Sequence, residues 1–157
     1  GAEFEIKPFG IRAMDSMRLE KSYRLIPREM SIEYSAYESG LDRFVKLDKE
    51  NDFIGKSALK EWQDRGPING FVTLEVLGIV DADARGSEAI YKDGEVVGRA
   101  TSGGFGWRCD KSLALGLVRL ELSALGTELE IEILGEKYKA IVIEESPFDS
   151  TNECLRS

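Results

Sequence analysis

The chain has 157 residues, with 21 Lys and Arg against 29 Asp and Glu, no histidine and a formal net charge of −8. The absence of histidine excludes histidine-ligated metal sites and the commonest general base, and the acidic balance argues against nucleic acid as a partner. No apolar run reaches the roughly 20 residues needed to cross a bilayer, so we expect no membrane contact.

The first half of the chain is predicted to contain two helices. Pro8 stands where a helix can begin, and apolar residues follow at spacing three, which predicts a helix near residues 9–21. Apolar residues at spacing four after Gly55 predict a second helix near residues 55–64.

Strand candidates are scarce in the first half. Residues 44–47 could form a short strand, but one or two strands cannot make a sheet for these helices to cover. We therefore expect residues 1–69 to be a truncated α/β portion of a longer protein, with apolar surface left exposed.

Residues 66–70, Gly-Pro-Ile-Asn-Gly, mark a boundary, and the pattern after it is β. Residues 71–77 alternate in polarity, which predicts a half-buried strand. A hairpin is expected across Asp93-Gly94, a type I′ turn pair, and a second across Gly135-Glu136. With residues 112–120, these segments give about six short strands, which predict a small antiparallel barrel or sandwich.

Glu20 is the candidate site residue that the first helix provides. On a helix, Ala13, Ser16, Met17 and Glu20 share one face, so a carboxylate continues a stripe of small and apolar side chains. Such a carboxylate could lie at the mouth of a cleft and accept hydrogen bonds from a ring N–H and an exocyclic amino group. Alternatively, it forms an ordinary surface interaction with Ser16 or Arg24.

Residues 98–107 form the one glycine-dense stretch, which could cradle a ligand or form a bend at a barrel corner. The stretch lacks the P-loop spacing, so it does not predict a nucleotide site. Cys109 and Cys154 form no metal-binding pattern and are expected to be reduced thiols. Residues alone therefore indicate neither catalytic nor metal-ligating groups.

Residues 8–23 contain Ala-x-Asp-Ser-x-Arg-Leu-Glu and resemble the folate-binding aminomethyltransferase family, which includes the glycine cleavage T-protein. Four later segments resemble the same family in the same order, namely 40–49, 52–59, 101–104 and 114–118. Within the family, the chain resembles the C-terminal region of dimethylglycine and sarcosine dehydrogenases. That branch is indicated by Lys21-Ser22-Tyr23, by residues 103–107 and by residues 152–157.

The resemblance implies an α+β chain. Residues 1–69 would be the C-terminal part of the folate-binding domain, and residues 70–157 the family's terminal six-stranded β-barrel. It also implies one-carbon transfer to tetrahydrofolate after an FAD-dependent oxidation of an N-methyl amine in an upstream domain. By position, Glu20 matches the glutamate that holds the pterin, and Tyr23 and Lys49 are further folate-binding candidates.

The family's catalytic aspartate has no counterpart in this sequence, so the chain is expected to be inactive alone. Its expected partners are folate and the upstream domains, with self-association through exposed apolar surface. Its expected location is the cytoplasm, or the mitochondrial matrix if the source is eukaryotic. Two alternatives remain open: a non-catalytic structural or dimerisation module of a larger flavoenzyme, and part of a free-standing T-protein-like aminomethyltransferase.

Overall fold

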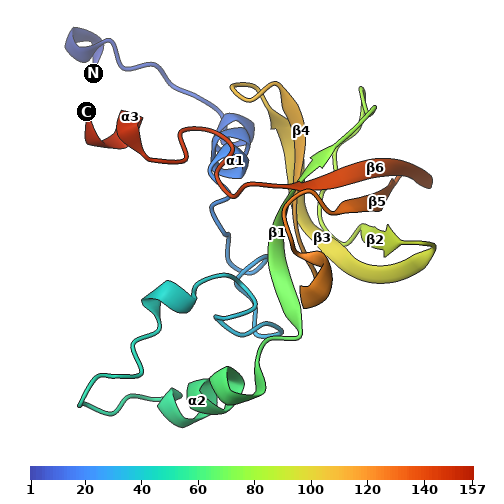
Figure 1. The fold of residues 1–157 in the computed structure, drawn as a ribbon. Coiled ribbons are helices and arrows are strands. Elements are labelled where there is room, and N and C mark those ends of the chain that lie inside the picture. Colours follow the sequence, from blue (N-terminus) through green and yellow to red (C-terminus); the bar gives the residue numbers. More distant parts are fainter.

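The computed structural model describes residues 1–157, except for the side chain of Leu155. Six antiparallel strands form a closed barrel in the order β1-β4-β3-β2-β5-β6 (Figure 1). This confirms the predicted barrel. The strands are β1 (Asn69–Val76), β2 (Ala89–Lys92), β3 (Glu95–Gly106), β4 (Lys111–Arg119), β5 (Glu128–Ile133) and β6 (Glu136–Ile143).

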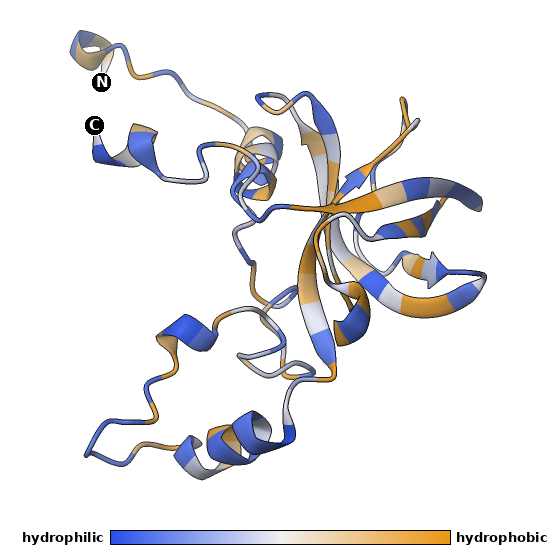
Figure 2. Cartoon of the chain, in the orientation of Figure 1, coloured by the Kyte–Doolittle hydropathy of each residue, from blue (hydrophilic) through white to orange (hydrophobic). Residues whose placement is uncertain are grey.

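The barrel interior is a single apolar core. Alternate residues of each strand point inward, as the period of two requires, and Leu74, Ile90 and Ile131 are fully buried there. Orange and blue segments accordingly alternate along strands such as β1 and β3 (Figure 2). The polar residues of β1, which point away from the barrel interior, are however not all exposed to solvent. Thr73, expected to be exposed, is buried on the outside of the barrel.

Both predicted hairpins are present. Asp93 and Gly94 have φ angles of 51° and 83°, the positive values that a type I′ turn needs. The second turn lies at Leu134 and Gly135, one residue earlier than predicted, and Leu134 has a φ of 53°. The second turn is therefore shifted by one residue, while β5 and β6 pair as expected.

The glycine-dense stretch is not a corner, as one interpretation had it, because residues 98–106 belong to the 12-residue strand β3. Its register against β4 shifts between Ala100 and Ser102. Gly98 allows close approach, since a Cβ there would lie 2.2 Å from the carbonyl oxygen of Leu117. The glycines thus permit tight strand packing within the barrel wall.

Helix α1 (Ile11–Glu20) confirms the first predicted helix and lies on the outside of the barrel. Its last turn packs through Leu19 on Leu113 and Leu115 of β4, and Phe71 and Ile143 border this second apolar cluster. Ile11 is 71% exposed, and Met14 and Met17 are also exposed. The apolar row that predicted the helix therefore faces away from the barrel.

Residues 42–66 form an arm that extends away from the barrel (Figure 1). The arm contains the short 3-10 helix η2 (Asp42–Phe44) and α2 (Lys56–Arg65), the second predicted helix, which has no buried residue. The strand expected at residues 44–47 is absent, because the described chain places no strand beside it for pairing. Phe44 instead lies exposed beneath the guanidinium of Arg43.

Three short helices complete the chain: η1 (Ala2–Phe4), η3 (Leu120–Leu122) and α3 (Glu153–Arg156). Both cysteines are free, as expected. Among the described helices, none combines the length and apolar character that a membrane crossing requires.

Candidate functional site

Glu20 is the last residue of α1, and its side chain is only 2% exposed. The carboxylate oxygen Oε1 accepts a hydrogen bond of 2.6 Å from the backbone N–H of Arg108, in the turn between β3 and β4. The surface interaction that the sequence left open is not formed. Arg24 pairs with Glu145 instead, and the hydroxyl of Ser16 donates to the carbonyl oxygen of Phe105.

The stripe expected on α1 is only partly correct. Ser16 and Glu20 face β3, but Ala13 and Met17 are exposed. The helix meets the barrel with its last turn, where Arg18, Leu19 and Glu20 are all buried. Periodicity gave the members of each face, but it could not tell which face would meet the barrel.

Gly106 makes room for the Glu20 side chain. A Cβ at Gly106 would lie 3.1 Å from Cγ of Glu20 and 2.9 Å from Cδ1 of Leu113. A larger residue would therefore push the carboxylate away from the Arg108 amide. The glycine beside Trp107 thus has a role in the site that the sequence did not reveal.

The C-terminal segment forms the third wall beside Glu20. The backbone N–H of Phe148 donates to the carbonyl oxygen of Glu20 at 3.0 Å. The ammonium of Lys21 donates to the carbonyl oxygens of Phe148 and Asp149 and to the side chain of Asn152. Three segments distant in sequence therefore meet at the end of α1.

The carboxylate of Glu20 affects the pKa of a neighbouring thiol, that of Cys109. Burial raises the pKa of Cys109, the negative charge of Glu20 raises it further, and the ammonium of Lys111 opposes both effects. Among the described residues, no hydrogen bond reaches Oε2 of Glu20. One oxygen is thus held by the fold, and the other remains available as an acceptor.

Tyr23 and Lys49 are not brought together with Glu20 by any described contact. The Tyr23 side chain is 53% exposed, and its carbonyl oxygen accepts from Arg18. Lys49 lies on the arm, where its carbonyl oxygen accepts from the ammonium of Lys56. Of the three candidates, Glu20 is the one whose side chain is buried and hydrogen-bonded within the described residues.

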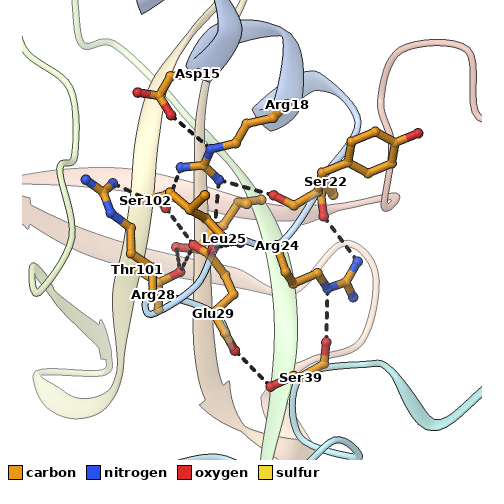
Figure 3. A network of polar contacts seen from close by, with 12 residues as sticks. Asp15, Arg18, Ser22, Arg24, Leu25, Arg28, Glu29, Ser39, Thr101 and Ser102 are labelled. Carbon is orange, nitrogen blue, oxygen red and sulfur yellow. Dashed lines mark hydrogen bonds and ion pairs between the residues drawn. The ribbon is translucent and has the colours of Figure 1, made fainter. Parts of the chain in front are cut away.

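A buried polar network next to α1 escaped sequence analysis (Figure 3). Its centre is Glu29, which is 0% exposed and accepts from the hydroxyls of Thr101 and Ser102, each at 2.6 Å. Arg18 donates to Ser102 at 2.9 Å and pairs with Asp15. Because Thr101 and Ser102 lie more than 70 residues from Glu29 and Arg18 in sequence, no local pattern could have indicated these contacts.

A cavity of about 500 Å³ lies between α1, β3 and the loop that leads to β2. Ser16, Leu19 and Trp107 are among the residues that line it, whereas Glu20 is not. The cavity therefore adjoins the helix of Glu20 without including the Glu20 side chain in its lining. No described group of carboxylates and thiols could hold a metal ion.

Comparisons with known proteins agree over most of the chain. The model of the glycine cleavage T-protein C-terminal barrel domain matches residues 70–149, and that of the GCVT N-terminal domain matches residues 1–49. The mitochondrial dimethylglycine dehydrogenase of Homo sapiens is 43% identical over 145 residues, which cover 92% of this chain and 17% of the relative. An aminomethyltransferase of Symbiobacterium thermophilum is 37% identical over 150 residues, or 94% of this chain and 39% of the relative.

Among solved structures, the glycine cleavage system aminomethyltransferase T of Bartonella henselae superposes with a TM-score of 0.86 at 25% identity. The superposition covers 94% of this chain and 41% of that structure. The chain thus spans less than a fifth of the length of the dehydrogenases that it matches, and about two fifths of the aminomethyltransferases.

Proposed function

Because the chain belongs to the glycine cleavage T-protein family, we propose that it is a tetrahydrofolate-binding module in which Glu20 holds the pterin ring. The observation that carries this proposal is the state of the Glu20 carboxylate. Its Oε1 is fixed by the Arg108 amide, the side chain is buried, and Oε2 takes no hydrogen bond from the described residues. A carboxylate held in this way can accept hydrogen bonds from a ring that offers an N–H and an amino group as donors.

The contribution of this chain to the reaction is binding and orientation. Residues of this chain would hold tetrahydrofolate, which would supply the acceptor for a one-carbon unit. Glu20 would receive two ring donors and fix the plane of the pterin, since charge-assisted hydrogen bonds are strong and directional. Tyr23 and Lys49 would contact the folate only if the ligand or another segment reaches them.

Similarity to dimethylglycine dehydrogenases supports a larger parent protein in which FAD on another domain oxidises an N-methyl amine. In that parent, the exposed row of Ile11, Met14 and Met17 would be covered by other segments. The matrix of mitochondria is the proposed location if the source is eukaryotic. We propose no proton transfer by residues 1–157, because the family's catalytic aspartate matches none of them.

Titration calorimetry with the full-length protein and tetrahydrofolate tests the role of Glu20. Glu20→Gln keeps an oxygen for the Arg108 amide but removes the charge and places an amide where Oε2 was. We expect binding to weaken by about 1.5–3 kcal/mol, the value of a hydrogen bond to a charged group. Glu95→Gln is the matched control, since Glu95 pairs with Arg119 on the surface.

Unchanged affinity of Glu20→Gln would remove Glu20 from the binding site. Hydrogen exchange separates the proposal from a purely structural module. Tetrahydrofolate should protect the amides of α1 and of the β3–β4 turn, whereas a module that only clamps or dimerises a larger enzyme would show no protection there.

A further inference from the structure

The cavity beside α1 is lined by charged side chains from three separate segments. Arg12, Asp15 and Arg18 come from α1, Arg28 from the loop that follows it, and Asp83 and Arg85 from the loop between β1 and β2. Four arginines and two aspartates therefore line one hollow of about 500 Å³. Such a basic concentration is unexpected in a chain with a formal net charge of −8.

Most of this positive charge is not neutralised within the described residues. Arg18 pairs with Asp15 and approaches Glu29. Arg12, Arg28 and Arg85 form no ion pair with any described carboxylate. These three side chains are exposed, so solvent screens them in part, but they outnumber Asp83, the other carboxylate of the lining besides Asp15, and the hollow therefore favours anions.

The unpaired guanidinium groups also keep free donors. Arg28 gives one nitrogen to the carbonyl oxygen of Arg85 and approaches the hydroxyl of Ser102. The side chains of Arg12 and Arg85 donate to no described residue. Each guanidinium can therefore offer two parallel N–H groups, the geometry that matches a carboxylate or a phosphate.

An aromatic edge borders the same cavity. Trp107 is 79% exposed and meets Phe105 in an edge-to-face contact with ring centroids 4.9 Å apart, and both residues line the hollow. An exposed indole that is held by a second ring offers a flat surface to a ligand. The cavity thus combines donors for an anion with a surface for a ring.

We propose that this cavity is an oxyanion-binding site, which takes the carboxylate or phosphate group of a small molecule on Arg12, Arg28 and Arg85. The site is separate from the Glu20 carboxylate, so it holds whether or not Glu20 binds a pterin. Two sources could supply the oxyanion: the glutamyl carboxylates of a folate, or a free anion.

Calorimetry on the full-length protein tests the site with four probes. Inorganic phosphate and tricarballylate represent free anions, and tetrahydrofolate with one or with three γ-linked glutamates represents the folate tail. The variants are Arg12→Gln, Arg85→Gln and their combination, which break no described contact of either side chain. Arg119→Gln is the matched control, since Arg119 pairs with Glu95 outside the cavity.

Each substitution in the cavity should weaken oxyanion binding about ten-fold, while Arg119→Gln should leave it unchanged. Loss confined to phosphate or tricarballylate identifies a free anion. A loss that is larger for the triglutamate than for the monoglutamate identifies the folate tail. The proposal is overturned if no probe binds more tightly than about 10 mM, or if the double variant binds every probe as well as the unmodified protein.

Discussion

The hydroxyl of Ser102 lies between two buried charges: it donates to the carboxylate of Glu29 at 2.6 Å and accepts from the guanidinium of Arg18 at 2.9 Å. Glu29 also accepts from the backbone N–H of Leu25 at 2.8 Å. The contacts join the last turn of α1, the loop after it and strand β3 (Figure 3). The position of α1 on the barrel, and with it the position of Glu20, depends on this network.

Glu29→Ala should therefore destabilise the fold by about 3 kcal/mol or more, because it removes the acceptor of the buried Thr101 and Ser102 hydroxyls and leaves Arg18 with Asp15 as its one carboxylate partner. Glu29→Gln preserves the shape and should cost less, about 1–3 kcal/mol. Urea unfolding of the 157-residue chain measures both. Glu33→Ala is the control, since Glu33 pairs with Arg99 at the surface and should change stability by less than about 1 kcal/mol. Equal losses at positions 29 and 33 would contradict the role of the network.

Cys109 reports the charge of Glu20. Burial and the Glu20 carboxylate both raise the pKa of the thiol, so Glu20→Gln should lower that pKa and speed alkylation by iodoacetamide at pH 8. Lys111→Gln should have the opposite effect, because Lys111 lowers the same pKa. A Cys154→Ser background restricts the reaction to Cys109. Identical rates in all variants would show that Glu20 carries no charge near the thiol.

Glu38 should make stability depend on acid pH. Burial alone would raise its pKa, but hydrogen bonds from Ser35 and Asn69 outweigh burial and hold the pKa below its usual value. A lowered pKa in the folded state stabilises the protein above the pKa of the unfolded state, about 4.3. This contribution is lost as pH falls through the folded value.

Glu38→Gln should accordingly lower the free energy of unfolding at pH 7, and the difference from the unmodified chain should shrink below about pH 4. Urea unfolding at pH 7 and pH 3 measures the difference. A gap of equal size at both pH values would assign the effect of Gln to packing instead of charge.

Gly98 is required by the spacing of β3 and β4. Gly98→Ala would place a Cβ 2.2 Å from the Leu117 carbonyl oxygen and 2.8 Å from the Val118 Cα, both backbone atoms. We expect a loss of about 3 kcal/mol in thermal or urea unfolding. Gly10→Ala meets no atom within 4 Å and should cost less than about 1 kcal/mol. A tolerated alanine at position 98 would mean that the two strands can separate locally.

The strands and hairpins could be predicted because their signals are local, whereas these signals left a barrel and a sandwich open and only the family resemblance implied the barrel. Asp93-Gly94 and the alternation in β1, β5 and β6 fix turns and faces within a few residues. The position of Glu20 could be predicted only in part, because the partner of its carboxylate, the Arg108 amide, lies 88 residues away. The contacts of Glu29 with Thr101 and Ser102 could not be predicted for the same reason, since these residues also lie far away in sequence. The arm was misread at residues 44–47 because strand propensity does not provide a pairing partner.

Closure of the barrel has a consequence for how the molecule associates. Strand β1 pairs with both β4 and β6, and each of the other strands likewise has a neighbour on either side. Free edge is confined to short stretches, since β2 meets β5 through two residue pairs and residues 101–106 of β3 pair with β4 alone, and closure therefore disfavours edge-to-edge aggregation along most of the ring. A companion polypeptide would accordingly find most of its contacts in side chains, on the arm, on the outward row of α1 or on the loops, and single substitutions can measure each of these contacts.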